Sequence, residues 1–378
     1  MTLRVAMAAG EASGDLLAAS ILPALAQGAP ADCAGIGGDR MVAAGFRAWW
    51  HVRELSVRGY AEVLRHLPRL LALRRALIVR IRTWPAQVFV GVDAPDFNLG
   101  VAVRLRQQGI RTVQFVAPAI WAWRPQRLRL VQQGVDHLLT VFPFEHDLFV
   151  AAGVRTTYVG HPLAAMLPAQ PDAAAARARL ALSATAPTLA VLPGSRPAEL
   201  EQLLTPFLQT VVWLQRRDAA LQAVVAAADA HLARDIEAAR RRLELDPARV
   251  HIVTGRSHDC LEAADVVLVA SGTATLETLL LGRPMVIAYR VSWLTEWITR
   301  RKALISHIGL PNILAGERIV PEFLQEDVRA EILGPALAAL LEGGAAVARL
   351  RERFASIRAA LTRDTPARVV EAIVDAAR

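Results

Sequence analysis

Short apolar segments of strand length alternate with longer amphipathic segments along the first half of the chain. Each apolar segment is followed by a turn of small or polar residues and then by a segment with helical spacing. The strands predicted in this half are 4–9, 87–92, 111–116, 137–141 and 156–159. Strands that alternate with helices predict a parallel sheet covered by helices on both faces.

The same alternation resumes in the second half after an interruption at residues 166–187, where prolines and an alanine run replace it. We expect a linker there. The strands predicted beyond it are 188–192, 223–227, 250–253, 266–269 and 285–289. From residue 327 to the end the pattern is helical. The chain is therefore expected to be an α/β protein with two parallel sheets, and no repeat of fixed period relates its halves.

The length of 378 residues fits two domains that share a cleft better than one small module. Hydrophobic residues make up 54% of the chain and charged residues 21%, which excludes a disordered or fibrous protein. Cys33 and Cys260 are far apart and fit neither a disulfide framework nor a zinc ribbon. No signal peptide and no stretch of about 18 uncharged apolar residues is present. We expect a chain in a reducing compartment that does not span a membrane.

The net charge is +8, and of the 43 cationic residues only Lys302 is a lysine. The near absence of lysine indicates a bias in the composition of the whole chain rather than selection of arginine at each site. The distribution is more informative, because residues 53–82 hold eight arginines and two glutamates. Such a basic segment attracts nucleic acid, anionic lipid or phosphorylated metabolites, and composition alone does not choose among them.

Residues 60–81 within this segment have apolar side chains at near-helical spacing, interleaved with arginines. Pro68 is expected to break or kink the helix. One interpretation is a core helix with a solvated face, and the other is a surface that enters an anionic membrane and receives a lipid substrate. The candidate membrane-facing residues are Val63, Leu64, Leu67, Arg69, Leu71 and Arg75.

Two turns in the first half follow predicted strands and carry carboxylates. Residues 10–15 read Gly-Glu-Ala-Ser-Gly-Asp, in which glycines allow a ligand close to the backbone and free N–H groups at a helix start attract anions. The alternative is a tight turn capped by Ser13, although Glu11 has no structural need to be there. In the second turn Pro95 stiffens the segment between Asp93 and Asp96. Asp93 is the candidate general base, while Asp96 is also explained as a helix cap.

Two turns in the second half have the same strand-to-helix setting. Pro-Gly-Ser-Arg at 193–196 brings a guanidinium and a hydroxyl to a site that suits a diphosphate. In the segment 270–277, Thr273 and Glu277 share a helix face, so that Glu277 can accept hydrogen bonds from the hydroxyls of a ribose. The alternative is a buried glutamate satisfied by helix-terminal donors. No carboxylate–histidine cluster has metal-ligand spacing, and no metal or cofactor is expected.

The segment Trp121-Ala122-Trp123-Arg124 places two tryptophans beside a cation. It forms either an aromatic shelf with a phosphate clamp or a tryptophan pair buried at an interdomain surface.

Taken together and in order, these motifs resemble the lipid-A-disaccharide synthase family, which are glycosyltransferases of Gram-negative bacteria. The resemblance covers almost the whole chain. Its segments are 10–15, 35–38 with Met41, 90–98, 121–124, 142–145, 160–162, 192–196, 271–277, 310–316, 320–322 and 324–326.

The resemblance implies a glycosyltransferase fold of the GT-B type, with two Rossmann-like domains facing a cleft. It implies an acceptor-binding domain at 1–165, a linker at 166–187, a UDP-sugar domain at 188–345, and helices at 346–378 that cross back to the first domain. The implied catalytic residues are Asp93 and Glu11. The implied UDP-sugar contacts are Gly194, Ser195, Arg196, Ser271, Gly272, Thr273, Glu277, Asn312 and Gln325. The implied acceptor contacts are Ser13, Gly14, Asp96, Asn98 and Arg124.

The activity implied is an inverting, metal-independent transfer of 2,3-diacylglucosamine from UDP to the 6-hydroxyl of 2,3-diacylglucosamine 1-phosphate, also called lipid X. The products are the β-1,6 lipid A disaccharide 1-phosphate and UDP. The resemblance also implies a cytoplasmic protein attached peripherally to the inner face of the inner membrane, with a possible homodimer and no nucleic-acid partner. Two other hypotheses remain: a UDP-sugar epimerase or soluble-acceptor transferase with this fold, and a basic non-catalytic module that binds RNA or membrane.

Overall fold

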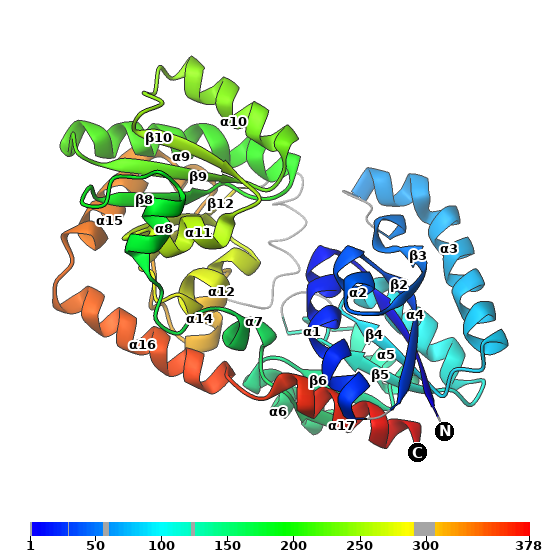
Figure 1. The fold of residues 1–378 in the computed structure, drawn as a ribbon. Coiled ribbons are helices and arrows are strands. Elements are labelled where there is room, and N and C mark those ends of the chain that lie inside the picture. The colour runs from blue at the N-terminus through cyan, green and yellow to red at the C-terminus, as the bar shows by residue number, and fades with distance from the viewer. Residues whose placement is uncertain (1, 29, 56–59, 122–124, 291–306) are drawn as a thin grey trace. The chain divides into compact units, whose positions relative to one another are not determined.

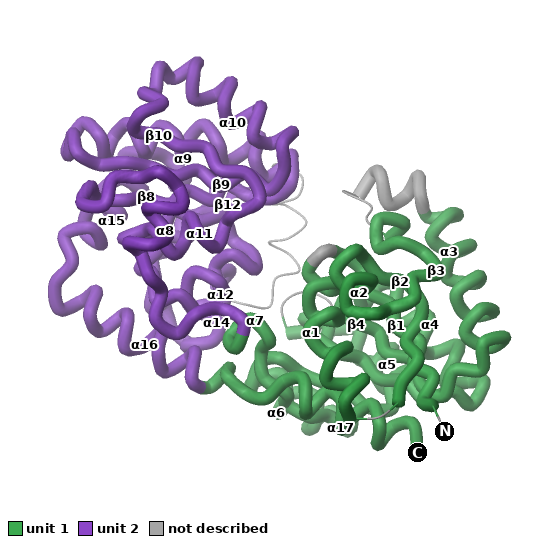
Figure 2. The backbone as a smooth tube through the Cα atoms, in the orientation of Figure 1, with its two compact units in different colours: residues 1–165, 360–378 green, residues 166–359 purple. Residues whose placement is uncertain are grey.

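In the computed structural model the chain forms two α/β units, each built around one parallel sheet (Figures 1 and 2). The structure describes residues 2–28, 30–55, 60–121, 125–290 and 307–378, without the side chains of residues 12 and 60–66. Unit 1 consists of Met1–Ala165 and Ala360–Arg378, and unit 2 of Met166–Ala359. The expected α/β class with two parallel sheets is confirmed.

The sheet of unit 1 has seven parallel strands in the order β3-β2-β1-β4-β5-β6-β7. The strands are β1 (Leu3–Ala9), β2 (Ala31–Gly37), β3 (Arg47–His51), β4 (Val88–Val92), β5 (Arg111–Phe115), β6 (His137–Thr140) and β7 (Thr156–Tyr158). Every residue of β4 is buried, as expected of a central parallel strand. The chain runs outward from β1 to β3 and then returns to β4, so the strand order reverses between β1 and β4. In open α/β sheets ligands bind at the carboxyl ends of the strands at such a point.

The helices of unit 1 surround this sheet (Figure 1). They are α1 (Ala12–Gly28), α2 (Asp39–Ala43), η1 (Val52–Glu54), α3 (Tyr60–Thr83), α4 (Pro95–Arg106), α5 (Arg127–Gly134), α6 (Pro143–Ala151) and α17 (Thr365–Ala377). α7 (Pro162–Met166) leads into unit 2. Of the break or kink expected at Pro68, the break is wrong, because α3 continues through this residue as one helix. α17 packs on α1 and β5, and its apolar face is buried.

The sheet of unit 2 has six parallel strands in the order β10-β9-β8-β11-β12-β13. They are β8 (Thr188–Leu192), β9 (Gln222–Ala227), β10 (Val250–Thr254), β11 (Val266–Ala270), β12 (Met285–Tyr289) and β13 (Glu322–Leu324). The order reverses between β8 and β11. This second switch point lies between the strands that precede the Pro-Gly-Ser-Arg and Ser-Gly-Thr turns.

The helices of unit 2 are α8 (Ala173–Arg179), α9 (Pro197–Arg217), α10 (Ala230–Arg242), α11 (Ser257–Ala263), α12 (Thr273–Leu280), α14 (Leu310–Ala315), η2 (Gln325–Asp327), α15 (Ala330–Glu342) and α16 (Ala345–Leu361). The segment 166–187, expected as a linker, contains α8, whose Arg177 pairs with Asp265 at 2.8 Å. This segment therefore belongs to unit 2. The helices expected to cross back from residue 346 join unit 1 only from Ala360, because most of α16 lies in unit 2.

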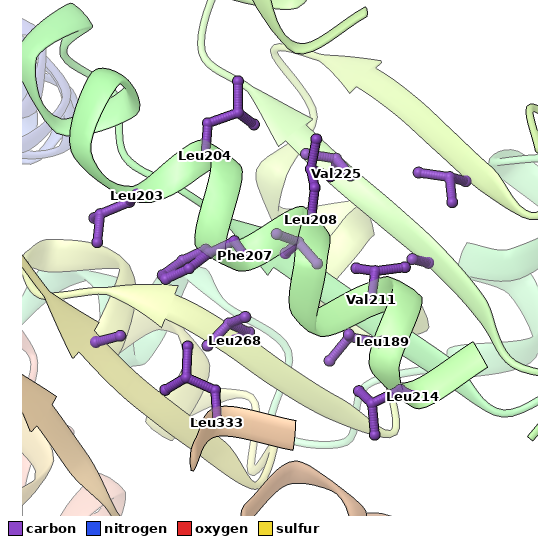
Figure 3. Packing of buried hydrophobic residues seen from close by; sticks show 14 of the residues in the cluster. Leu189, Leu203, Leu204, Phe207, Leu208, Val211, Leu214, Val225, Leu268 and Leu333 are labelled. Atoms are coloured by element: carbon purple, nitrogen blue, oxygen red, sulfur yellow. The ribbon is translucent and has the colours of Figure 1, made fainter. Parts of the chain in front are cut away.

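The core of unit 2 lies between α9, the sheet and α15, as Figure 3 shows. Phe207 on α9 is fully buried among Leu268 of β11, Leu333 of α15 and neighbouring aliphatic side chains. Removing a buried phenylalanine ring from such a core costs about 3–5 kcal/mol. This packing holds the amino end of α9, and with it the turn at 193–196, against the carboxyl end of β8.

In the part of the chain that the structure describes, no single helix is long and apolar enough to cross a membrane. One pair of consecutive helical segments, Ala330–Glu342 and Ala345–Ala377, is long and apolar enough only when the two are taken together, and the pair is bent by 87°.

Candidate active site

Unit 2 carries a cavity of about 460 Å³ at the carboxyl ends of its strands. The turns that follow β8 and β11 line it, together with residues that follow β9 and β10. It therefore lies at the switch point of the second sheet, where a nucleotide is expected to bind. The predicted UDP-sugar residues that line it are Gly194, Ser195, Arg196, Ser271, Gly272, Thr273 and Glu277.

The turn at 194–196 is built around Glu199, a residue that the sequence analysis missed. Glu199 Oε2 accepts hydrogen bonds from the N–H groups of Ser195 at 3.0 Å and Arg196 at 3.3 Å. Gly194 has a φ of +119°, and a Cβ there would lie 2.6 Å from Glu199 Cβ, so only glycine fits. The Arg196 side chain is 60% exposed at the cavity, 3.4 Å from Glu199 Oε1. This guanidinium is available to an anionic ligand.

The second wall of the cavity is the start of α12. Gly272 precedes the helix and no side chain caps it, so the first N–H groups of α12 are free for an anion. The Ser271 hydroxyl donates instead to the carbonyl of Ile308 at 2.9 Å. Glu277 lies one turn into α12, and its Oε2 is 3.2 Å from Nε2 of His258 on α11.

Tyr289, at the end of β12, is a further lining residue that the sequence analysis missed. Burial raises the pKa of its hydroxyl, the Glu199 carboxylate raises it further, and the Arg196 guanidinium lowers it. The hydroxyl therefore stays protonated at neutral pH and adds a donor to the cavity wall.

Asn312 and Gln325, both predicted to contact the UDP-sugar, are not among the residues that line this cavity. The Asn312 side chain is fully buried and its hydrogen bonds are all used. Its Nδ2 donates to Val320 O and Glu322 Oε1, and its Oδ1 accepts from the N–H groups of Ile319 and Val320. Asn312 therefore holds α14 to the segment that leads into β13. Gln325 is half-buried in η2 with a φ of +51°, a strained conformation for a residue other than glycine.

In unit 1 the turns after β1 and β4 touch, and they flank the switch point of the first sheet. A Cβ on Gly10 would lie 2.0 Å from the Cβ of Ala94, so glycine is required for this approach. Asp93 and Ala94 have φ values of +54° and +43°. Such left-handed conformations are costly outside glycine and cluster at functional sites.

The environment of Asp93 favours its neutral form. Burial raises the pKa of the Asp93 carboxyl and the Glu11 carboxylate raises it further, while the Ala94 N–H and the Arg127 guanidinium lower it. A base whose pKa is shifted toward neutrality accepts a proton more effectively than an ordinary aspartate. The two predicted catalytic residues, Asp93 and Glu11, are therefore electrostatically coupled neighbours.

Three of the predicted acceptor contacts have structural roles in this turn region. Asn98 is fully buried, and its Nδ2 donates to the carbonyls of Asp93 at 2.8 Å, Ala8 at 3.0 Å and Val92 at 3.3 Å. Gly14 is buried where a Cβ would lie 3.3 Å from the Val92 carbonyl oxygen. Asp96 is no helix cap, because α4 begins at Pro95; its Oδ1 lies 2.6 Å from Nη2 of Arg127.

The remaining acceptor contacts are Ser13, which is exposed in the first turn of α1, and Arg124, which lies outside the described residues. Ser13 is no cap, because the helix already begins at Ala12. In the part of the chain that the structure describes, no group of three or more His, Cys, Asp or Glu side chains lies close enough to hold a metal ion.

Of the candidate membrane-facing residues, the side chains of Val63 and Leu64 lie outside the described part of α3. Leu67 and Leu71 are 43% and 40% exposed on one face of this helix, and Arg75 is exposed with them. Another face of the helix is buried against the sheet through Leu73, Leu77 and Ile81. Arg69 donates to the carbonyl of Glu54 at 2.8 Å.

Comparison with known proteins shows the family to which this chain belongs. The model of the lipid-A-disaccharide synthetase family matches residues 5–370. The chain belongs to this family. It is 46% identical over 376 residues to the lipid-A-disaccharide synthase of Cupriavidus pinatubonensis, covering 99% of this chain and 93% of that protein. It is 45% identical over 377 residues to that of Albidiferax ferrireducens, covering 98% and 96%.

Solved structures similar to this member of the family are distant in sequence and share its fold. They include Acinetobacter baumannii MurG, with a TM-score of 0.59 and 14% identity over 99% of this chain and 100% of that chain. A putative UDP-N-acetylglucosamine 2-epimerase from Listeria monocytogenes has a TM-score of 0.67 and 12% identity over 99% and 96%. The fold is therefore that of GT-B glycosyltransferases and related epimerases.

Two further residues of this family member, Glu199 at the cavity and His258 beside Glu277, were missed, and only Glu199 had a signal in the sequence. Glu199 is the third residue of α9, where a glutamate that reaches back to the helix start is common, but the first residue of the motif is here Arg196 rather than serine or threonine. His258 comes from a helix after a different strand, and nothing in its local sequence relates it to Glu277.

Proposed function

We propose that the protein transfers 2,3-diacylglucosamine from UDP to the 6-hydroxyl of 2,3-diacylglucosamine 1-phosphate, which yields the β-1,6-linked disaccharide 1-phosphate and UDP. Membership of the lipid-A-disaccharide synthase family makes the protein a glycosyltransferase of lipid A biosynthesis. The observation that carries the proposal for the site is the cavity at the switch point of unit 2, which is lined by an arginine turn, a free helix start and a carboxylate.

On the donor side, the diphosphate binds between Arg196 and the start of α12 at Gly272 and Thr273. The guanidinium and the helix N–H groups neutralise charge that develops on UDP as the bond from the sugar C1 to the diphosphate oxygen breaks. Glu277 accepts hydrogen bonds from the ribose hydroxyls. The Ser195 and Arg196 N–H groups donate to Glu199, which holds the turn in the shape that presents Arg196 to the diphosphate.

On the acceptor side, Asp93 accepts the proton of the 6-hydroxyl while the hydroxyl oxygen forms its bond to C1. The reaction is a single displacement, so the anomeric configuration inverts, and UDP leaves with the electron pair of the broken bond. Burial and Glu11 raise the pKa of Asp93, which supports its assignment as the base. Trp121, half-buried after β5, provides an aromatic shelf for the acceptor.

The acceptor and donor both carry acyl chains, so the protein must meet them at a membrane surface. We propose peripheral attachment to the inner face of the inner membrane through the exposed face of α3. Two exposed leucines beside Arg75 support this assignment, since apolar side chains enter the acyl boundary while arginines pair with anionic headgroups.

One assay tests the proposed reaction. The purified protein is mixed with UDP-2,3-diacylglucosamine and 2,3-diacylglucosamine 1-phosphate in detergent that contains a chelator, and the lipid products are analysed by mass spectrometry. We expect a disaccharide phosphate and one equivalent of UDP. Release of UDP without disaccharide, or conversion of the donor sugar without an acceptor, would contradict the proposal.

A further inference from the structure

Glu145 is a buried carboxyl that forms no ion pair with any residue that the structure describes. It lies in the first turn of α6, and its side chain is 2% exposed. Its Oε1 accepts a hydrogen bond from the indole Nε1 of Trp121 at 3.1 Å. Among the described residues its Oε2 is buried with no hydrogen-bond partner at normal geometry. A carboxyl that is buried without a full set of hydrogen bonds destabilises the fold, whereas an apolar side chain in the same place would not.

The indole that Glu145 holds belongs to a chain of ring contacts. Trp121 meets Phe144 edge-on, with ring centroids 5.1 Å apart and an interplanar angle of 82°. Phe144 stacks on Phe142 at 5.9 Å, and Phe142 stacks on His161 at 5.5 Å. The hydrogen bond from Nε1 and the edge-on contact together fix both the position and the plane of the Trp121 ring, part of which remains open.

This cluster lies at the edge of the first sheet that carries Asp93. Asp93 follows β4, Trp121 follows β5 and Glu145 follows β6, and these three strands are neighbours in the sheet. In a parallel sheet the carboxyl ends of neighbouring strands share one edge. The cluster therefore lies at the same edge of the sheet as the proposed base.

We infer that Glu145 is a positioning residue that holds the Trp121 ring in the orientation in which it receives the sugar of the acceptor. The inference rests on the proposed function, because it takes Trp121 as a wall of the acceptor site. It assigns Glu145 no contact with the reacting atoms. Burial raises the pKa of Glu145 to about 8, partly offset by the Trp121 indole and by the Phe142 and Val141 N–H groups, so the carboxyl is neutral at pH 7. A neutral carboxyl and a glutamine amide both offer an oxygen to the indole N–H.

The experiment compares Glu145→Gln, Glu145→Leu and Trp121→Phe with the wild type, and measures kcat and KM separately for acceptor and donor. Loss of one indole hydrogen bond changes affinity by roughly three- to tenfold. We expect Glu145→Leu and Trp121→Phe each to raise the acceptor KM by about that factor without changing the donor KM. Glu145→Gln is expected to retain a wild-type acceptor KM. The double variant Glu145→Leu with Trp121→Phe is expected to be no worse than either single variant, because both remove the same contact.

Asp147→Leu is the matched control, since Asp147 is an exposed acid on the same helix. If Glu145 served only as a cap of α6, Glu145→Leu would lower the melting temperature and leave the acceptor KM unchanged, which overturns the inference. A wild-type acceptor KM in Trp121→Phe overturns it too, even if Glu145→Leu does not fold. Absence of disaccharide from the wild type would instead refute the proposed function itself.

Discussion

Oε2 of Glu277 lies 3.2 Å from Nε2 of His258, so two helices that follow different strands meet at the nucleotide cavity. Glu277 is 16% exposed and His258 49% exposed, which leaves the carboxylate largely sheltered and the imidazole at the rim. The pair fixes the direction of the carboxylate that we assign to the ribose. A contact of this kind near the protein surface contributes only about 0.2–1 kcal/mol.

The first prediction separates the two members of this pair. Glu277→Ala is expected to weaken UDP binding by about tenfold or more, because it removes the ribose acceptor, which corresponds to at least ~1.4 kcal/mol. His258→Ala is expected to weaken it by at most about fivefold. Isothermal titration with UDP measures both. Glu201→Ala, an exposed acid on α9 outside the cavity lining, serves as control. Unchanged affinity in Glu277→Ala would remove the ribose role.

The second prediction concerns the proposed base. Asp93→Asn is expected to lower kcat by roughly 10²–10⁴-fold, the usual contribution of a general base. Asparagine tolerates the φ of +54° at this position, so the turn should keep its shape. UDP affinity should stay at the wild-type value, because the residues that line the nucleotide cavity all belong to unit 2. Rapid-quench turnover together with UDP titration gives both quantities, and a variant that turns over normally excludes Asp93 as the base.

The sequence predicted the four turns at the two switch points because their signal is local. An apolar strand, a glycine or proline and a helix start stand next to one another in the chain, and the structure places these turns beside β1, β4, β8 and β11. The strands β2, β3 and β13 were missed. β2 reads Ala-Asp-Cys-Ala-Gly-Ile-Gly, with a single β-branched residue, so it lacks the usual composition of a strand. Only glycine fits at position 35, because a Cβ there would lie 2.0 Å from the carbonyl oxygen of Met7.

The sequence analysis predicted ligand contacts for two asparagines whose side chains bond to the protein backbone instead. Asn98 and Asn312 lie in segments that resemble the family, which indicates their importance but not the reason for it. Both are fully buried; Asn98 bonds to backbone groups of the turn after β4, and Asn312 to those of the segment that leads into β13. Spacing along the chain does not distinguish an amide that faces a ligand from one that satisfies backbone groups, since the difference lies in the direction of the side chain.

The third prediction is a pH dependence of stability at Glu145. The ordinary pKa of this carboxyl is 4.5 and burial raises it to about 8 in the folded protein. The unfolded chain therefore releases this proton at a lower pH than the folded chain does. The contribution of the Glu145 carboxyl to the free energy of unfolding is fully present below pH 4.5 and is lost as the pH rises to about 8. Glutamine cannot titrate and has no such slope.

Urea unfolding of the wild type and Glu145→Gln at pH 5 and pH 8 measures this effect. We expect the variant to gain stability relative to the wild type by a few kcal/mol on going from the lower to the higher pH, at most ~1.4 kcal/mol per pH unit. A difference between the two proteins that does not change with pH would show that Glu145 is not held neutral by burial.

The fourth prediction tests the exposed face of α3 as a membrane surface. Burying an exposed leucine fully contributes roughly 1.5–3 kcal/mol, and Leu67 and Leu71 are 43% and 40% exposed. The double variant Leu67→Ser with Leu71→Ser is expected to lower binding to phosphatidylglycerol vesicles by more than tenfold, with UDP affinity unchanged. Arg75→Glu should weaken binding most at low salt, because ions screen its attraction to anionic headgroups.

Val42→Ser supplies the matched control, since Val42 is 49% exposed on α2 and lies outside the proposed surface. Vesicle co-sedimentation at low and high salt, with neutral phosphatidylcholine as a second lipid, separates the apolar from the electrostatic contribution. If the apolar face enters the bilayer, the leucine variants lose binding at both salt concentrations, while Arg75→Glu loses it mainly at low salt. Equal losses in Val42→Ser and in the leucine variant would mean that α3 has no special part in membrane attachment, and the acyl chains would have to be received elsewhere on the protein.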